Sequence, residues 1–486
     1  MYEVPEIRVR AVVAIVCTVS ACAITRGEDV IRIGSRRELL VDDCLIERLT
    51  GGCELRLHAP VPREVVFTSD RPWEGNLMFH VTVFRDGDIF RMYYRGWDYD
   101  EPQQRASAHK VICYAESRDG LNWERPELGI VEFQGSSRNN IILDCRTGMA
   151  SNGAFAVFRD DNPRCDPKAR YKALALHKEY GSGLYAFGSA DGLHWSLLEE
   201  RPLITDGAFD SHNLAFWDAH AGNYRAYWRY FDEGVRAIRT ATSPDFIHWS
   251  DGQDLRYGAA QREHLYTNAV QRYPRAPHFL VGFPKRLVPE RRSHTDFHLP
   301  GVSDGIFMSS RDGVHFHRWS EAFIRPGAQI DRWVNRNNFT AWGLIETPSS
   351  LEGAPSELSL YSTEGYYRGP ATRLRRYTLR QDGFVSAYAP FSGGELITRP
   401  LTFTGRRLEI NFSSSAAGSL RIEMQDADGR PIDGFALADC PEIFGDEIRR
   451  VVRFKRGHDV SRLAGTPVRL RLVMKDADVY AFRFTE

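Results

Sequence analysis

The sequence of 486 residues has no excess of charge of either sign and, after residue 23, no long hydrophobic run. Its 63 lysines and arginines are balanced by 64 aspartates and glutamates, which leaves no broad basic surface for nucleic acid or an anionic membrane. A bilayer span needs about 20 consecutive apolar residues. We therefore expect no nucleic-acid partner and no transmembrane segment in the mature chain.

Cysteine and histidine pairs at the spacing that binds zinc are also missing, since no C-x-x-C occurs. Six cysteines follow residue 23, and an oxidising compartment would allow disulfides among them. Cys44 and Cys53 flank a short turn, and Cys145 and Cys165 are a second candidate pair. We predict no cofactor. A structural calcium stays open at "QDADG", although the missing remainder of the twelve-residue ligand pattern favours a hairpin turn there.

The N-terminal segment has the composition of an export signal. Arg8 and Arg10 precede the apolar run "AVVAIVCTVSACA", which is too short to span a bilayer and ends in small residues suited to cleavage. The stretch "VSAC" also resembles a lipobox that would attach a lipid to Cys22. We predict a signal peptide over residues 1–23 and a secreted or periplasmic protein, with simple cleavage favoured over lipidation of Cys22.

A pattern close to Ser-x-Asp-Gly-x-x-Trp occurs four times, as "SRDGLNW", "SADGLHW", "SPDFIHW" and "SRDGVHF", beginning at Ser117, Ser189, Ser243 and Ser310. Three short segments rich in β-branched and aromatic residues precede each copy, which predicts three strands. Spacings of 72, 54 and 67 residues that each hold several strands are typical of propeller blades. Because Asp-Gly favours a tight turn, we interpret the repeat as the turn before a blade's outer strand, a structural role.

A fifth strand triplet without a clear repeat follows the fourth copy, and from about Phe391 the strands lack the repeat altogether. We therefore predict an all-β chain in which a five-bladed β-propeller over residues 68–390 is followed by a jelly-roll-like β-sandwich over residues 391–486. Residues 24–67 are predicted to form a lead-in that packs on the propeller.

Polar residues gather where the first strand of each predicted blade begins, and in a propeller these positions converge on the central channel. Three of them are carboxylates, and carboxylates that face one axis divide into acid and base roles. Glycoside hydrolysis needs such a division. We predict Glu263 as general acid, Glu74 as base or nucleophile, and Asp210 as the group that stabilises positive charge on the sugar ring. The alternative is that these groups cap strand ends.

Further channel-facing side chains are suited to sugar hydroxyls or to stacking on sugar rings. The predicted substrate-binding residues are Asn76, Asn152, His212, Asn213, His264, Asn268, Arg336, Asn337 and Trp73. Arginine pairs well with carboxylate or sulfate groups, and a loop over residues 284–298 adds further basic residues, Lys285 among them. We expect a carbohydrate substrate that is acidic or sulfated, and we predict no metal ligand.

These turns, the strand triplets and the C-terminal strands make the chain similar to the invertase- and arabinanase-like glycoside hydrolases, families 32 and 43. The likeness is greatest to uncharacterised secreted bacterial proteins with the stretches "LVDD", "WEGN", "FDSHN", "WVNRNN" and "TRLRRYTLR", and it covers nearly the whole mature chain. It implies catalytic acids on blades one, three and four, which fall on Glu74, Asp210 and Glu263. The chain departs from the families in having Glu on blade one and in lacking "NDPNG", "RDP" and "EC".

We therefore predict a secreted glycoside hydrolase that acts on a polysaccharide or oligosaccharide by two-carboxylate chemistry in the propeller channel. A non-catalytic carbohydrate-binding propeller is the alternative. Two carboxyl groups about 5–9.5 Å apart across an open pocket would favour the enzyme.

Overall fold

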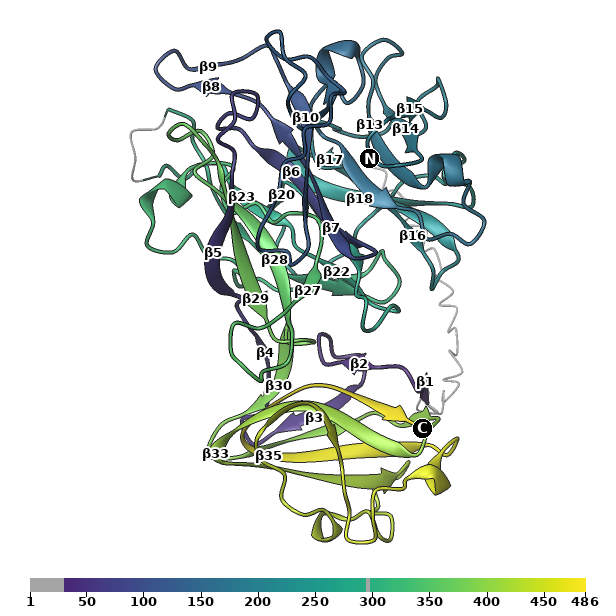
Figure 1. The fold of residues 1–486 in the computed structure, drawn as a ribbon. Helices are drawn as coiled ribbons and strands as arrows, with labels where there is room; N and C mark the ends of the chain where they lie inside the picture. Colours follow the sequence, from purple (N-terminus) through teal and green to yellow (C-terminus); the bar gives the residue numbers. More distant parts are fainter. Residues whose placement is uncertain (1–29, 294–297) are drawn as a thin grey trace, which may run out of the picture.

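The structure is a computed structural model that describes residues 30–293 and 298–486, so the predicted signal peptide over residues 1–23 and Cys22 lie outside the described residues. Two bodies are visible in Figure 1. The upper body holds the strands from β5 to β29, and the lower body holds β1 to β4 together with β30 to β35. No helix among the described residues is long and apolar enough to cross a membrane.

Five four-stranded antiparallel sheets make up most of the upper body. Sheets 1 to 3 follow one another along the chain. Sheet 1 contains β6 (Phe79–Asp86), β7 (Ile89–Gly96), β10 (Val111–Ser117) and β11 (Ile141–Asp144), and sheet 2 contains β12 (Ala156–Arg159), β13 (Tyr171–Leu176), β14 (Leu184–Ser189) and β15 (Ser196–Leu197). Sheet 3 contains β16 (Leu214–Asp218), β17 (Asn223–Asp232), β18 (Val235–Ser243) and β19 (Gln253–Asp254). The short strands β8 (Tyr99–Asp100) and β9 (Arg105–Ala106) pair with each other.

Sheet 4 is interrupted, because its strands form two separate hydrogen-bonded parts. The four-stranded part contains β21 (Gln271–Arg272), β22 (Leu280–Gly282), β25 (Met308–Ser310) and β26 (Phe316–Arg318), and the three-stranded part contains β20 (His264–Leu265), β23 (Lys285–Val288) and β24 (Val302–Gly305). Sheet 5 contains β27 (Ile345–Thr347), β28 (Glu357–Glu364), β29 (Arg373–Leu379) and β5 (Val61–Thr68). The outer strand of sheet 5 therefore comes from the N-terminal side of the other four sheets.

The first strands of neighbouring sheets contact one another, which places them together inside the upper body. Strand β12 contacts both β6 and β16, and β27 contacts β6. Between sheets 3 and 4, the Ser211 hydroxyl donates to the Tyr266 carbonyl oxygen at 2.9 Å. Between sheets 4 and 5, Trp342 Nε1 donates to the Val270 carbonyl oxygen at 2.9 Å.

The repeated Ser-x-Asp-Gly turn has the same hydrogen bonds in all four copies. In the first copy the Ser117 hydroxyl accepts from the Gly120 N–H at 2.9 Å, and Asp119 Oδ1 accepts from the next two N–H groups at 2.8 Å. The equivalent bonds recur at Ser189, Ser243 and Ser310. The turn joins the third strand of a sheet to the segment of its outer strand, so its role is structural.

The lower body contains one ten-stranded sheet network built from both ends of the described chain. Its strands are β1 (Ile31–Gly34), β2 (Glu38–Leu39), β3 (Ile46–Thr50), β4 (Glu54–Leu57), β30 (Val385–Ala389), β31 (Gly394–Thr398), β32 (Leu401–Phe403), β33 (Arg407–Asp426), β34 (Asp446–Val451) and β35 (Val468–Thr485). Five short 3-10 helices complete the described elements: η1 (Cys145–Thr147), η2 (Pro167–Ala169), η3 (Ile330–Trp333), η4 (Leu437–Asp439) and η5 (Ser461–Leu463).

The N-terminal segment differs from its predicted place as a lead-in over residues 24–67. Strands β1 to β4 pair with C-terminal strands instead of packing on the upper body alone, and β5 completes sheet 5. The physical reason is that an edge strand has backbone N–H and C=O groups that need partners. The N-terminal strands supply these partners to strands from the C-terminal part of the chain. The six described cysteines are free thiols, so neither candidate disulfide forms.

Candidate functional site

Tyr266, which follows β20, is surrounded by four cationic side chains from different elements. The Cζ atoms of Arg229, Arg236 and Arg336 lie 5.2, 5.2 and 5.9 Å from the centre of its ring, and Lys285 Nζ lies at 4.4 Å. Arg229 and Arg236 belong to β17 and β18 of sheet 3, Lys285 to β23 of sheet 4, and Arg336 to the loop after η3. We call these four side chains the central cationic cluster.

Aromatic side chains from sheets 1, 4 and 5 lie beneath this cluster. The Phe79 ring centre is 4.0 Å from that of Phe339 and 6.5 Å from that of Tyr266. Tyr366 and Tyr367 belong to the same buried group. The cluster therefore lies near the segments that adjoin the first strands of several sheets.

The arginines change the acidity of the Tyr266 phenol. Burial raises the pKa of Tyr266, but the charges of Arg336, Arg229 and Arg236 outweigh it, and the pKa is lowered from its usual value of 10.0. A buried phenol without cationic neighbours shows the opposite shift, as Tyr185 does, whose pKa is raised by burial. Tyr266 is only 6% exposed, so its ionisation is controlled by these side chains rather than by water.

Lys285 has a buried side-chain amine with no hydrogen-bond partner. Its side chain has no exposed surface, and its Nζ is unpaired. Burial, together with the charges of Arg336, Arg236 and Arg229, lowers the pKa of Lys285 well below its usual value. An amine in this position has little tendency to carry charge until a negative group approaches it.

Asp210, in the loop before β16, pairs with Arg229 at the edge of the cluster. Its side chain is 73% exposed, whereas that of Arg229 is 3% exposed. Among the residues that the structure describes, Asp210 is the one carboxylate within ion-pair distance of the four cations. Arg229 thus contacts both an exposed carboxylate and the buried Tyr266 ring.

Glu74 does not occupy an open site. Its side chain is fully buried and receives hydrogen bonds from Arg125 Nε at 2.7 Å and Nη2 at 3.1 Å, from the Tyr94 hydroxyl at 2.5 Å and from the Arg71 N–H at 3.0 Å. These donors occupy both carboxylate oxygens. The prediction of Glu74 as base or nucleophile is contradicted, because neither oxygen is free to reach a sugar or a water.

Glu263 is also engaged in ion pairs. Its oxygens lie 3.0 Å from Arg286 Nη1 and 2.7 Å from Arg318 Nη1, and its side chain is 25% exposed. It lines a pocket of about 170 Å³ that Arg236 also reaches. This geometry does not support the role of general acid, since both oxygens already accept hydrogen bonds from arginine side chains.

Burial lowers the pKa of both predicted histidines, His212 and His264, which favours the neutral form of each ring. His212 is 1% exposed, its Nε2 lies 3.3 Å from the Thr82 hydroxyl, and burial lowers its pKa to about 3. The neighbouring His80, whose ring centre is 5.3 Å away, has a pKa shifted in the same direction by burial. His264 Nδ1 accepts from the Arg236 N–H at 3.2 Å, and burial lowers its pKa. His212 therefore does not carry a proton to a substrate.

The side chains of the five predicted asparagines form hydrogen bonds with the backbone, which leaves their amide groups engaged within the protein. They are Asn76, Asn152, Asn213, Asn268 and Asn337, and their side-chain amides donate to backbone carbonyl oxygens at 2.9–3.5 Å. All but Asn152 are buried. The reason is that the loops entering the inner strands leave carbonyl groups without ladder partners, and an amide side chain satisfies them.

Trp73 lies away from the cluster. Its Nε1 donates to Asn140 Oδ1 at 2.7 Å, and its ring contacts Phe133 edge-on at 6.1 Å. It is partly buried and packs against the core between sheets 1 and 5, so its contacts place it in that core and not among the residues around Tyr266. Of the predicted binding residues, Arg336 is the one that lies in the central cationic cluster.

Sequence reasoning did not select Arg229, Arg236 or Tyr266. Tyr266 stands within "EHLYTN", one of the polar stretches considered, and the two arginines lie near the end of the strand "YRAYWRYF" and near the start of the strand "VRAIRTATS". A charged residue at an otherwise apolar strand end is a weak signal, because most such residues face solvent. Lys285 was noted only as part of a basic loop, although it is buried.

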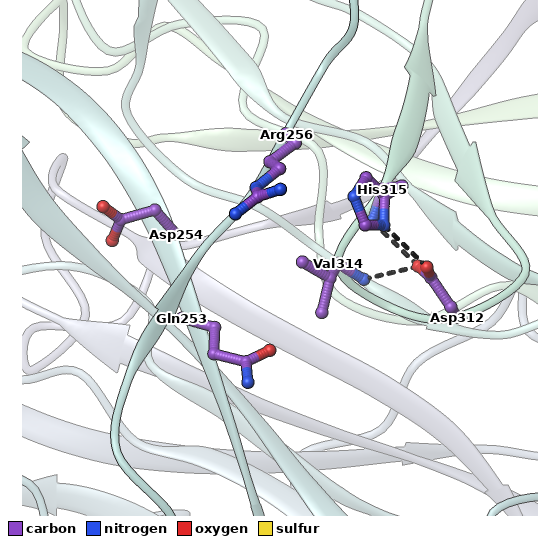
Figure 2. Close-up of a pocket in the computed structure, with 6 residues that line it drawn as sticks. All are labelled: Gln253, Asp254, Arg256, Asp312, Val314 and His315. Atoms are coloured by element: carbon purple, nitrogen blue, oxygen red, sulfur yellow. Dashed lines mark hydrogen bonds and ion pairs between the residues drawn. The ribbon is translucent and has the colours of Figure 1, made fainter. Parts of the chain in front are cut away.

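A second pocket, of about 530 Å³, lies at the turn of the fourth repeat. Figure 2 shows its lining by Gln253, Asp254, Arg256 and the turn residues Asp312, Val314 and His315. The Asp312 carboxylate accepts from the Val314 N–H at 2.8 Å and contacts His315 Nδ1 at 2.7 Å. Since the same Asp–His contact occurs at His194 and His248 in other copies, this geometry belongs to the repeat.

No group of three or more His, Cys, Asp or Glu side chains suited to a metal ion occurs among residues 30–293 and 298–486. At "QDADG", Asp426 Oδ1 accepts from the N–H groups of Asp428 and Arg430 at 3.0 and 2.9 Å. The carboxylate of Asp428 pairs with Arg430. These contacts form a turn and do not present a set of calcium ligands.

No family model and no curated protein matches the chain. Solved structures similar to it include an endo-arabinase from Bacteroides thetaiotaomicron (10% identity, 64% of this chain and 96% of that chain, TM-score 0.38). A GH62 α-L-arabinofuranosidase catalytic domain from Coprinopsis cinerea (9%, 66% and 97%, 0.42) and a GH32 β-fructofuranosidase from Bombyx mori (11%, 89% and 94%, 0.40) are further examples. The resemblance predicted from the sequence is to glycosidases of this type. At such identities and scores it assigns no role to any residue.

Proposed function

We propose that the chain is a glycoside hydrolase acting on an acidic polysaccharide or oligosaccharide at the edge of the central cationic cluster. The observation that carries this proposal is the position of Arg229, which contacts an exposed carboxylate, Asp210, and a buried phenol, Tyr266. A carboxylate and a phenol of lowered pKa are a base and a proton donor, which are the two groups that hydrolysis of a glycosidic bond requires.

In the proposed reaction, the Asp210 carboxylate takes a proton from a water molecule while the water oxygen bonds to the anomeric carbon. The bond from that carbon to the glycosidic oxygen breaks, and the Tyr266 hydroxyl gives its proton to the departing oxygen. Two features support these roles: the exposure of Asp210 leaves it open to water, and a lowered pKa makes Tyr266 a better proton donor than an ordinary phenol.

We further propose that the five sheets are the blades of a propeller, that the lower body is a β-sandwich, and that the protein is exported. The contacts between first strands of neighbouring sheets support the first proposal. A propeller completed by β5 would join strands from both ends of the chain in its last blade, which ties the ring together without a covalent link.

The test is a screen of the purified protein against plant and algal polysaccharides, including acidic and sulfated ones, with reducing ends as the readout. Asp210→Asn and Tyr266→Phe should each lower turnover by about 10²-fold or more, the usual contribution of a positioned acid or base. The matched controls are Asp88→Asn and Tyr180→Phe, which change exposed side chains in turns and should leave turnover unaltered. Full activity in both site variants would refute the proposed roles.

A carbohydrate-binding propeller is the second candidate. It is favoured by the ion pairs of Glu74 and Glu263, which remove two of the three predicted catalytic carboxylates. An acidic glycan that binds the wild-type protein without release of reducing ends would support this second function.

A further inference from the structure

We propose that the guanidinium groups of Arg236 and Arg336 bind the acidic group of the sugar, a carboxylate or a sulfate, and that Lys285 takes up a proton when this group binds. The inference rests on the proposed function only for the identity of the ligand as a sugar. The site it describes is an anion-binding subsite beside Tyr266, formed by the two guanidinium groups that make no ion pair with Asp210.

Positive charge around the Tyr266 ring is poorly compensated. Three guanidinium groups lie within 5.9 Å of the centre of this ring, and within the described chain one carboxylate, that of Asp210, pairs with any of them. Like charges this close repel strongly when buried. The chain keeps them together in the folded state, and a bound anion would reduce this repulsion.

Some donors of the cluster are unused. The Nε atoms of Arg229 and Arg236 and the Nζ atom of Lys285 are buried and have no hydrogen-bond partner. Buried donors in folded proteins are almost always paired, so the unpaired Nε of the partly exposed Arg236 fits an acceptor that comes from outside the chain. A carboxylate or sulfate supplies several acceptor oxygens and suits arginine in particular.

The members of the cluster differ in access to solvent. Arg236 and Arg336 are partly exposed, whereas Lys285 is fully buried. An anion would therefore contact the two guanidinium groups directly and act on Lys285 through its charge. Arg336 is also fixed in position, since its backbone has a φ of 67° in the left-handed region and its guanidinium packs 5.6 Å from the Tyr367 ring centre.

The proton uptake follows from the surroundings of Lys285. The charged and titratable groups around it are Arg229, Arg236, Tyr266 and Arg336, with His264 and Asp210 beyond them. The three arginines disfavour a further positive charge on Lys285, and an anion placed among them offsets that effect. Binding should then raise the pKa of Lys285 and draw a proton from the solvent.

The experiment is isothermal titration calorimetry of the full chain with uronate, sulfated and neutral oligosaccharides of equal length, each in two buffers that differ in ionisation enthalpy. We expect at least one acidic series to bind at least about tenfold more tightly than the neutral one, a ratio worth about 1.4 kcal/mol. The uronate and sulfate arms identify the acidic group. The apparent enthalpy should differ between the buffers by an amount that indicates proton uptake.

Variants separate the subsite from general folding effects. Arg336→Gln should weaken acidic ligands at least about tenfold with little change for neutral ones. Lys285→Met should remove the buffer dependence, and Lys178→Met, an exposed lysine, is the matched control that should retain it. If Lys285→Met does not fold, Arg336→Gln still decides the point, because its side chain is partly exposed.

Two outcomes would overturn the inference: equal affinity for acidic and neutral ligands, or unchanged buffer dependence in Lys285→Met. These results are distinct from a failure of the proposed function. Acidic ligands that bind as expected without being cleaved would leave the subsite standing and refute the hydrolase. Equal cleavage of neutral and acidic glycans would support the hydrolase and refute the subsite.

Discussion

At the scale of single residues, Glu74 is a buried carboxylate whose counter-ion is Arg125. Removal of one partner from a buried ion pair leaves the other charge uncompensated, which costs about 3–5 kcal/mol. We therefore expect Arg125→Met to lower the free energy of unfolding by about this amount in urea titrations. Arg138→Met, at a fully exposed pair with Glu127, is the control and should change little.

A catalytic role for Glu74 would give a different pattern. The account would be contradicted if Arg125→Met kept the stability of the wild type while activity fell, because that would make the pair part of the reaction rather than of the core.

His212 provides a prediction about pH. Its pKa is lowered to about 3 in the folded protein, so between its ordinary value of 6.5 and about 3 the unfolded chain binds a proton that the folded chain does not. Stability contributed by neutral His212 is present above pH 6.5 and is lost as the pH falls through this window, at up to about 1.4 kcal/mol per pH unit. His80 acts in the same direction.

The measurement is the free energy of urea unfolding at a series of pH values. His212→Gln should flatten the acidic slope relative to the wild type, because the folded chain would no longer hold a neutral ring at this position. An identical slope in the wild type and His212→Gln would show that this ring is not held neutral.

Two polar stretches singled out in the sequence, "FDSHN" and "EHLYTN", contribute Asp210 and Tyr266, which both contact Arg229. The side-chain amides of Asn213 and Asn268 in the same stretches instead donate to backbone carbonyl oxygens. A single sequence does not tell which polar side chains the backbone will use. Nor does it tell that Arg229 and Arg336, over a hundred residues apart, approach the same Tyr266 ring.

At the scale of elements, the repeated turn connects neighbouring sheets through tyrosine. The Tyr361 hydroxyl of sheet 5 donates to the Gly120 carbonyl oxygen at 2.6 Å, that of Tyr93 in sheet 1 to Gly192 at 3.1 Å, and that of Tyr227 in sheet 3 to the fourth copy of the turn at 3.0 Å. The sequence predicted a structural role for the repeat, with tryptophan packing between blades. The tyrosine bonds could not be predicted, because they join residues about 90 to 240 positions apart.

Two substitutions test this connection. Tyr93→Phe removes a buried inter-sheet hydrogen bond and should cost about 1 kcal/mol or somewhat more, since it leaves the Gly192 carbonyl without that donor. Gly192→Ala should cost more, because its φ is +82° and an added Cβ would lie 2.6 Å from the Tyr93 hydroxyl. Chemical denaturation gives both values, with Tyr180→Phe as the exposed control. The connection is refuted if Tyr93→Phe is as stable as Tyr180→Phe.

At the scale of the whole molecule, chain segments from both ends complete each body. Strand β5 closes sheet 5, and β1 to β4 pair with C-terminal strands. The all-β class and the strand triplets were predictable because alternation and turn residues are local signals. These long-range pairings were not, because nothing local to residues 31–68 specifies a partner more than 300 residues away.

Glu38 on β2 joins the lower body to sheet 4. It is fully buried, and its oxygens lie 2.9 Å from Arg311 Nη1 and 3.3 Å from His278 Nε2. Burial raises the pKa of Glu38, but these neighbours outweigh it and the pKa is lowered to about 2. The stability from ionised Glu38 is therefore present above its ordinary pKa of 4.5 and is lost as the pH falls toward 2.

We expect Glu38→Gln to weaken the junction between the two bodies. Differential scanning calorimetry at neutral pH should show a lower melting temperature and a split of the transition, since the bodies would unfold separately. Glu442→Gln, at an exposed position in the lower body, is the control. A single unshifted transition in Glu38→Gln would mean that other contacts hold the bodies together.

The central claim is that an acidic sugar binds at the cluster around Tyr266, and a crystal structure of the protein with an acidic oligosaccharide tests it most directly. The account predicts the acidic group within hydrogen-bond distance of Arg236 and Arg336, with the glycosidic bond between Asp210 and Tyr266. A sugar found instead in the pocket at Asp312 and His315, with the central cationic cluster unoccupied, would contradict the account.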